Sequence, residues 1–424
     1  EYTESFPPTS VIVNSSSRGD VTGKFSVGGL IGKMTGVVGH SFSSGDVEGE
    51  ENVGGLIGEV NVYQVSIFHS FSTSTATSSI GSGVVAGLVG LNNQTVNVNG
   101  IIENSFHTQG VCYNYNPSSP TAKARCEDGN TDSIIDISNL TSDGACNLLY
   151  FGCDGAFSVT AGSLPRIDYT GISEATRNNL LNLDFGKGTR SDPLIIETEA
   201  QWLGLEGQSV QNHLHTILSD DLTFDNDPDN FQYKPFNDRL RNYRFTGVLD
   251  GRHFSLKSIT YDQNFLNNQR YGLLIGSSLG GEVKNLHMKN SSIDGHSYTG
   301  LISSSSVAGR FKSLSFENIN LNFDGGYTSF VTGGFNYGDK IYDISIIGSN
   351  FIASGVGNGS YNGFISSWAA HSSFQDIIIR DSTLRDSETT QLNFSGMVVG
   401  RSGYWNQFDF LSVAEAKIDP LPCL

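Results

Sequence analysis

The sequence has few charged residues, no long apolar run and no basic stripe. Only 16% of its 424 residues are charged. No apolar stretch is long enough to cross a bilayer and no signal peptide is visible, so we expect the mature, soluble part of a protein that does not insert into membranes. Binding to phosphate backbones needs clustered Lys and Arg, whereas the net charge here is −18, which argues against nucleic acid as a partner.

Glycine and aromatic residues are abundant instead. The chain contains 50 Gly and 11% aromatic residues, a composition typical of turn-rich, strand-rich proteins and not of helical or disordered ones. Its length leaves room for two or three domains with a substantial core.

A ten-residue pattern at residues 284–293 organises the second half of the chain, because it recurs. Its copies are residues 312–321, 342–351 and 375–384, and looser copies begin at Lys257 and Asp409. Each of the four full copies has an apolar residue at the third, fifth and tenth places and a polar residue or Gly at the seventh. This pattern predicts a strand with one buried face, followed by a turn and the start of a second strand.

The spacing of these copies indicates stacked coils. Their starts are separated by 27, 28, 30, 33 and 34 residues, a quasi-period that is typical of a solenoid. If the coils stack, one residue from each copy should lie in a single buried column, and we expect this of Leu286, Leu314, Ile344 and Ile377.

A different repeat occupies the first part of the chain. Residues 19–32 recur at 45–58, an offset of 26 residues, and a partial copy lies at 86–90. Ser-Phe pairs lie between these copies. The Gly-Gly pairs within the repeat predict a backbone that turns tightly or approaches the next coil closely. His40 and His69 occupy equivalent positions, so we interpret them as stacked repeat residues and not as metal ligands.

The Gly-Gly-Leu-Ile-Gly segments, together with the Gly-Asp-Val and Ser-Phe-Ser elements, resemble the GLUG repeat of bacterial surface and secreted proteins. That family includes large adhesins and the non-catalytic region of immunoglobulin A proteases. The resemblance covers most of the chain and implies an all-β, right-handed parallel β-helix. It implies little about a ligand, because these repeats serve as scaffold in proteins of differing function.

We expect two tandem β-helix modules, at residues 1–165 and 172–424. The second opens in a way that resembles related β-helix modules. There, Thr198 and Gln201 form a capping-box pattern that predicts a short helix closing the end of the stack. The first module shows no comparable opening, so we expect either further chain upstream or an N-terminal coil that packs on something else.

Most of the cysteines lie at the end of the first module, where the repeat breaks down. Three pairings are open to Cys112, Cys126, Cys146 and Cys153, and we favour Cys112 with Cys126 and Cys146 with Cys153 because each bridge closes a short loop. Bridges there would suit an oxidising compartment, and free thiols in a reducing cell are the alternative. Cys423 is left over.

Five acidic residues crowd one segment of the second module: Asp220, Asp221, Asp225, Asp227 and Asp229. Their carboxylates could donate hard oxygen ligands to calcium, the only cofactor that the sequence suggests. A solvated acidic insertion explains the same composition, and we favour it over a metal site.

Two patterns typical of catalysis occur, and neither fits its context. Residues 276–280 match the nucleophile elbow of hydrolases, but that motif needs a strand-to-helix turn and here lies between two coils. A pectinase-like set of Asp132, Asp220, His296 and Arg310 has the right chain order. Its two carboxylates are 88 residues apart (220 minus 132), however, whereas a pair on adjacent coils would be one period apart. We therefore assign no catalytic residues.

Taken together, these features predict a non-enzymatic extracellular protein, an adhesin-like or fibre segment at a bacterial cell surface. Its partner would be a glycan or protein on a host or neighbouring cell. We expect the ligand at the irregular insertions, residues 107–165 and 207–244, because the coils are committed to packing. Two alternatives stay open: a filament subunit that self-associates end to end, and a polysaccharide lyase or hydrolase whose carboxylates converge in one groove.

Overall fold

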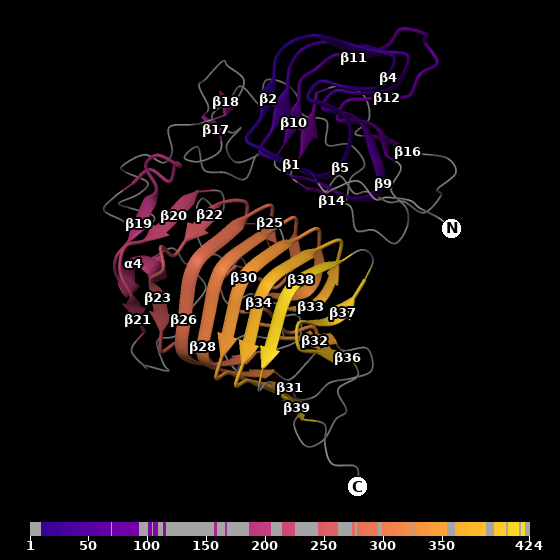
Figure 1. The fold of residues 1–424 in the computed structure, drawn as a ribbon. Helices are drawn as coiled ribbons and strands as arrows, with labels where there is room; N and C mark the ends of the chain where they lie inside the picture. The colour runs from indigo at the N-terminus through magenta and orange to yellow at the C-terminus, as the bar shows by residue number, and fades with distance from the viewer. Residues whose placement is uncertain are drawn as a thin grey trace. The chain divides into compact units, whose positions relative to one another are not determined.

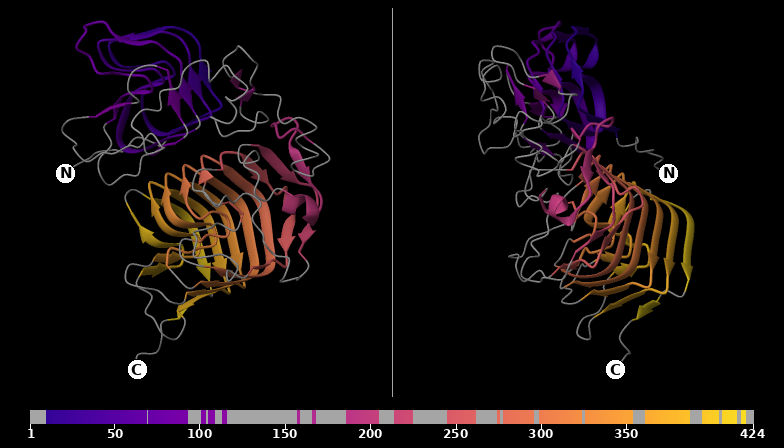
Figure 2. Two further views of the ribbon diagram at one scale, coloured as in Figure 1. Left: turned by 180° about the vertical axis from the view of Figure 1, so that it is seen from behind. Right: turned by 90° about the vertical axis from the view of Figure 1, so that its left-hand side faces the viewer.

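The computed structural model divides into two compact units, Glu1–Tyr169 and Thr170–Leu424. Both are parallel β-solenoids, in which each strand pairs with its counterpart one coil away (Figures 1 and 2). The structure describes residues 10–68, 70–92, 101–103, 105–108, 113–115, 157–158, 166–167, 186–204, 214–224, 245–261, 274–275, 278–295, 299–323, 326–353, 361–386, 394–403, 406–414 and 417–419. All five cysteines lie outside these ranges, so their predicted bridges do too.

The first unit contains four parallel sheets that run along its stack. The largest consists of β1 (Ser10–Val13), β5 (Ile31–Gly39), β9 (Ile57–Phe68), β13 (Val89–Asn92) and β16 (Tyr113–Tyr115), with β14 (Ile101–Glu103) also on β9. A second consists of β2 (Ser16–Ser17), β6 (Phe42–Ser43), β10 (Phe71–Ser72) and β15 (Phe106–His107). The other two are β3 (Val21–Thr22), β7 (Val47–Gly49) and β11 (Ala76–Ser78), and β4 (Phe25–Gly28), β8 (Glu51–Gly54) and β12 (Val85–Ala86). Strands β17 (Phe157–Ser158) and β18 (Arg166–Ile167) form a separate antiparallel pair.

The repeat of the first unit stacks in register. The rings of Phe42 and Phe71 lie parallel, with centroids 4.8 Å apart. Gly54 shows why its position requires glycine, since a Cβ there would lie 1.8 Å from the carbonyl oxygen of Ile57. The predicted close approach of backbones at the Gly pairs is therefore confirmed at this residue.

The largest sheet of the second unit runs along its whole stack. Its strands are β19 (Leu194–Ile196), β20 (His215–Leu218), β22 (Val248–Asp250), β26 (Glu282–Gly295), β28 (Arg310–Phe323), β30 (Lys340–Ile347), β34 (Ser373–Arg380) and β38 (Gln407–Ala414). Shorter strands pair alongside them: β21 (Leu222–Thr223), β23 (Ser255–Lys257), β24 (Thr260–Tyr261), β31 (Asn350–Ala353), β35 (Thr383–Asp386) and β39 (Lys417–Asp419). A second sheet contains β25 (Ser278–Leu279), β27 (Ser306–Val307), β29 (Thr332–Tyr337), β33 (Ser366–Ala370) and β37 (Val399–Ser402), and β32 (Tyr361–Gly363) pairs with β36 (Phe394–Gly396).

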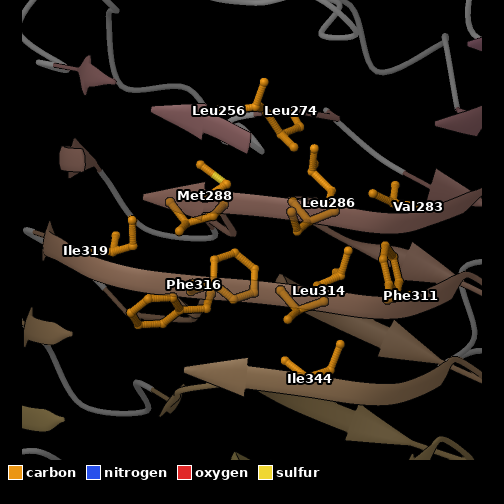
Figure 3. Packing of buried hydrophobic residues seen from close by; sticks show 14 of the residues in the cluster. Leu256, Leu274, Val283, Leu286, Met288, Phe311, Leu314, Phe316, Ile319 and Ile344 are labelled. Carbon is orange, nitrogen blue, oxygen red and sulfur yellow. The ribbon is translucent and has the colours of Figure 1, made fainter. Parts of the chain in front are cut away.

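The predicted buried column is present. Leu286 faces Leu314, which faces Ile344, which faces Ile377, each on the next parallel strand. All four side chains are buried in one hydrophobic cluster, part of which Figure 3 shows. The third, fifth and tenth places of the four full copies are buried throughout, so the alternation identified the core correctly.

The coil bends where the repeat places short polar residues. At the seventh place, Asn290, Asn318, Gly348 and Asp381 all have positive φ, between 48° and 60°. Asn, Asp and Gly adopt this conformation most readily, which explains the predicted turn there. The second place bends in the same way, at Asn285, Ser313, Asp343 and Asp376, and the sequence pattern did not reveal this corner.

The predicted copy that begins at Lys257 has the wrong register. Lys257 pairs with Lys289, the sixth place of the next copy, whereas Asp250 pairs with Lys284, the first place. The offset between these coils is therefore 34 residues at Asp250 (284 minus 250) and 32 at Lys257 (289 minus 257), and not 27. Alternation alone could not distinguish the two registers, because Ile259 and Tyr261, at the eighth and tenth places beyond the corner, alternate in sequence as the third and fifth places do.

A short helix, α4 (Glu199–Gly204), packs against β19 at the first coil of the second unit. The Gln201 side chain accepts hydrogen bonds from the backbone of Thr198, at 3.2 Å, and the Thr198 hydroxyl accepts one from the Gln201 amide, at 3.3 Å. The predicted capping box is confirmed. Trp202 is fully buried in the main cluster, so the helix covers the apolar end of the stack. No helix in the described residues is both long and apolar enough to span a bilayer.

Candidate functional site

The outer face of the second unit is formed by the solvent-facing side chains of β26, β28, β30 and β34. The two corners divide each coil of this face into three short facets. Inward positions repeat the same residue types from coil to coil, but outward positions do not. The residues at the first place of the repeat, on successive strands, are Lys284, Lys312, Tyr342, Gln375 and Asp409. The core is thus uniform while the surface chemistry changes along the stack.

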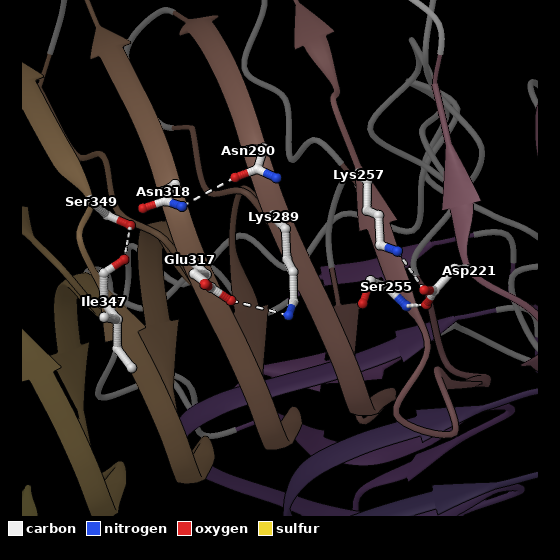
Figure 4. Close-up of polar contacts among 9 residues, drawn as sticks. All are labelled: Asp221, Ser255, Lys257, Lys289, Asn290, Glu317, Asn318, Ile347 and Ser349. Carbon is white, nitrogen blue, oxygen red and sulfur yellow. Dashed lines mark hydrogen bonds and ion pairs between the residues drawn. The ribbon is translucent and has the colours of Figure 1, made fainter.

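Polar pairs join neighbouring coils across the middle and last facets of this face. Lys289 forms an ion pair with Glu317 at 3.1 Å, and the Asn318 side chain donates to Asn290 at 3.1 Å (Figure 4). On the last facet, Asn350 donates to Asn320 at 3.0 Å. These side chains hold one coil to the next, which limits what they can offer to a ligand.

The first facet differs, because cations face cations there. Arg310 lies opposite Lys340, and Lys284 lies opposite Lys312, on adjacent strands. The Lys312 ammonium lies 5.4 Å from the centroid of the Tyr342 ring. Arg310 was considered above only as a member of the pectinase-like set, and this cluster was not predicted. Its signal was the spacing, since residues 310 and 340 are one period apart, as are 284 and 312.

Two of the five acidic residues considered as calcium ligands are described, and both make structural contacts. Asp221 accepts a hydrogen bond from the Ser255 amide at 2.6 Å and pairs with Lys257 at 2.5 Å (Figure 4). The hydrogen bond from Lys257 is the main cause of a lowered pKa at Asp221. Asp220 accepts from the Asp221 amide at 2.7 Å.

The other three, Asp225, Asp227 and Asp229, lie outside the described residues, so the calcium site stays a prediction. Among the residues that are described, no group of three His, Cys, Asp or Glu side chains could hold a metal ion.

The structure describes only part of the two catalytic patterns. Ser278, the central residue of the elbow motif, is buried on β25 and pairs in register with Ser306. It lies in a strand, where a nucleophile elbow needs an exposed turn. Arg310 begins β28, and Asp132 and His296 lie outside the described residues.

One carboxyl group is fully buried. Asp339 accepts hydrogen bonds through Oδ1 from the Ser306 hydroxyl and from the Gly309 amide, both at 2.8 Å. Its Oδ2 has no partner among the described residues. Burial raises the pKa of Asp339 from 3.8 to about 7, because the charged form loses its hydration. Its hydrogen bonds come from the turn of the preceding coil, so we assign it a structural role.

The chain was compared with known proteins in three ways. No family model matches it, no curated protein matches it, and no solved structure matches it. The resemblance to GLUG repeats therefore stays a prediction, and the fold that it implied, a parallel β-solenoid, is what the coordinates establish.

Proposed function

We propose that this protein is a non-enzymatic, adhesin-like or fibre segment at a cell surface, and that the outer face of its second unit presents a binding surface to a partner on another cell. Its acidic composition, with a net charge of −18, supports an extracellular setting because such a surface favours solubility there. A rigid stack of coils holds lateral side chains at fixed spacing, which suits recognition of an extended partner.

The observation that carries this proposal is the contrast between inward and outward positions. The inward column of Leu286, Leu314, Ile344 and Ile377 contains only branched aliphatic residues, which packing explains. The outward first place runs from Lys284 through Tyr342 to Asp409, which packing does not require. Because packing does not fix the outward positions, a binding surface can be built on them without disturbing the core.

Screening of the purified chain against glycans and intact cells, with and without a calcium chelator, tests the proposal. We expect saturable binding to at least one class of glycan or cell, and no turnover of the bound glycan. Release of shortened sugars would instead favour the lyase or hydrolase alternative. Loss of binding with the chelator would indicate that the acidic segment around Asp220 holds calcium.

A second candidate is the filament subunit, which the last coil of the stack favours. Phe408, Leu411 and Val413 on β38 continue the inward columns, yet they are 38%, 41% and 45% exposed. Buried counterparts such as Ile377 are 0% exposed one coil earlier. A coil from a second copy of this chain, added in the same register, would cover these side chains and the strand edge.

Self-association of this kind is tested by light scattering and electron microscopy at rising protein concentration. Leu411→Asp with Val413→Asp should abolish any polymer, since carboxylates cannot be buried between coils without a partner. Ser412→Asp, which adds charge at the outward-facing position between them, is the matched control and should leave polymers intact. A wild-type chain that stays monomeric at all concentrations rules out the filament.

A further inference from the structure

We propose that the first facet of the outer face binds an anionic polysaccharide whose chain runs along the solenoid axis. The site, which we call the basic facet, consists of Arg310, Lys312, Lys340 and Tyr342 on β28 and β30. The inference rests on the proposed function and names the class of partner for that same face.

The basic facet contains like charges in direct opposition. Arg310 and Lys340 are register partners on β28 and β30, and Lys284 and Lys312 are register partners on β26 and β28, while the second register partner of Arg310, on β26, is Glu282. Adjacent strands are about 4.8 Å apart, and like charges placed directly opposite each other destabilise a sheet. Binding of an anion would neutralise the repulsion between Arg310 and Lys340, which would explain why the two cations face each other.

Glu282 forms its ion pair with Lys284 and not with its register partner Arg310. Lys284 pairs with Glu282 at 3.4 Å and with Asp250 at 3.8 Å, so its charge is balanced. By contrast, no carboxylate of the described residues lies within 4.0 Å of the ammonium or guanidinium group of Arg310, Lys312 or Lys340. Three uncompensated cations on one facet, in a chain of net charge −18, form a local positive field.

The shape and borders of the facet favour a polysaccharide. The strands pair continuously, so the facet is flat and open along the stack, and successive cations repeat with the coil spacing. Tyr342 adds an aromatic ring with a polar edge beside the cations. Acidic residues flank the facet at Glu282 on one side and Asp409 on the other. A nucleic acid carries a phosphate on every nucleotide, whereas a polysaccharide can place uncharged sugars beside these carboxylates.

The experiment measures binding of the full chain to dextran sulfate and to polygalacturonate, with neutral dextran as the uncharged control. Biolayer interferometry at about 50 mM and about 300 mM NaCl should show binding to at least one polyanion that weakens at the higher salt concentration, because exposed charges are screened. Comparison of the two probes shows whether sulfate or carboxylate groups are preferred.

Two double variants, each of which removes two positive charges, distinguish binding at the basic facet from attraction to the overall charge of the protein. Arg310→Gln with Lys340→Gln should weaken polyanion binding about fivefold to tenfold, since two exposed ion pairs are lost. Lys24→Gln with Lys289→Gln removes two cations that are paired with Glu50 and Glu317, and should change binding less than about twofold. The first variant should also melt no lower than wild type, because it relieves a repulsion.

Equal losses in the two variants, or wild-type binding to dextran as tight as to both polyanions, would overturn the inference. A wild-type chain that adheres to cells or neutral glycans but to neither polyanion also overturns it, while the proposed function stands. A chain that binds no glycan and no cell contradicts both.

Discussion

The hydroxyl of Ser349 accepts a hydrogen bond from the Ile319 amide, one coil earlier, at 3.1 Å, and donates to the Ile347 carbonyl at 3.1 Å (Figure 4). The same double contact recurs at the equivalent corner of two other coils of this sheet. The Ser291 hydroxyl accepts a hydrogen bond from the Ile259 amide and donates one to the Lys289 carbonyl. The Ser382 hydroxyl accepts one from the Ser349 amide and donates one to the Arg380 carbonyl. A buried serine thus satisfies an amide of one coil and a carbonyl of its own, which fastens the two coils at the bend.

Replacing that hydroxyl should leave a buried amide without a partner. Ser349→Ala is expected to lower the free energy of unfolding by about 1–3 kcal/mol, the cost of an unsatisfied buried donor. Hydrogen exchange at the Ile319 amide should accelerate in the same variant. Ser345→Ala, which removes an outward hydroxyl from the preceding strand β30, should leave both quantities unchanged, and equal effects of the two substitutions would contradict this role.

The corner at Asn318 should tolerate glycine but not a branched residue. Its φ is 54°, and the equivalent residue of the next coil is Gly348, with a φ of 60°. Asn318→Val is expected to cost about 1–2 kcal/mol, because a β-branched side chain clashes with the backbone in the left-handed region. Asn318→Gly should cost less, since only an exposed hydrogen bond to Asn290 is lost. Urea denaturation of both variants checks this order.

A cavity within the main column should destabilise the second unit. Leu314 is 2% exposed between Leu286 and Ile344, so Leu314→Ala is expected to cost about 2–5 kcal/mol. Leu314→Ile keeps the volume and should cost less than about 1.5 kcal/mol. Tryptophan fluorescence follows this unit alone, because Trp202, Trp368 and Trp405 all belong to it. Similar losses for both variants would mean that the column is loosely packed.

The buried carboxyl of Asp339 should make stability fall as pH rises. The pKa of the Asp339 carboxyl is 3.8 in the unfolded chain and about 7 in the folded chain. Between these values the folded chain binds more protons, so the free energy of unfolding declines as pH increases and levels off above about 7. Each unit of pKa shift corresponds to about 1.4 kcal/mol.

Asp339→Asn should remove this contribution, so we expect the variant to gain stability relative to wild type at pH 8 more than at pH 5. The measurement is urea denaturation at both values. Burial lowers the pKa values of His215, His287 and His371, so their contribution to stability is lost as pH falls. This contribution is the same in the wild type and in the Asp339→Asn variant, so it cancels in the comparison. Asp381→Asn, at an exposed corner, is the control and should track wild type.

The core of the second unit could be predicted because burial forces repetition. Leu286 and its counterparts must match the coil above and below, so their types recur and the alternation exposes them. The register of the coil at Asp250 could not be predicted, since Arg252 and His253 bend the chain with φ of 48° and 67°, and the segment from Asp250 to Lys257 is two residues longer than its counterpart from Lys284 to Lys289. A local pattern of period two carries no information about such an insertion.

The candidate site was harder to predict than the core. Arg310 and Lys340 are ordinary surface residues in sequence, and only the register of β28 with β30 makes them neighbours. Asp339 follows Gly338, a pair that resembles an exposed turn, and its burial depends on the Ser306 and Gly309 contacts from another coil. Both features arise between coils, so they become visible only when the sequences of neighbouring coils are aligned with each other.

The matched inward columns make each coil of the second unit an exchangeable length of chain. If the coil that contains Ile344 and Ile346 were duplicated and inserted between β30 and β34, the added isoleucines would pack against the same residue types on both sides. Such an event would lengthen the stack by about 4.8 Å without exposing the interior. Evolution can therefore adjust the reach of this protein and the order of its surface groups by copying or deleting whole coils.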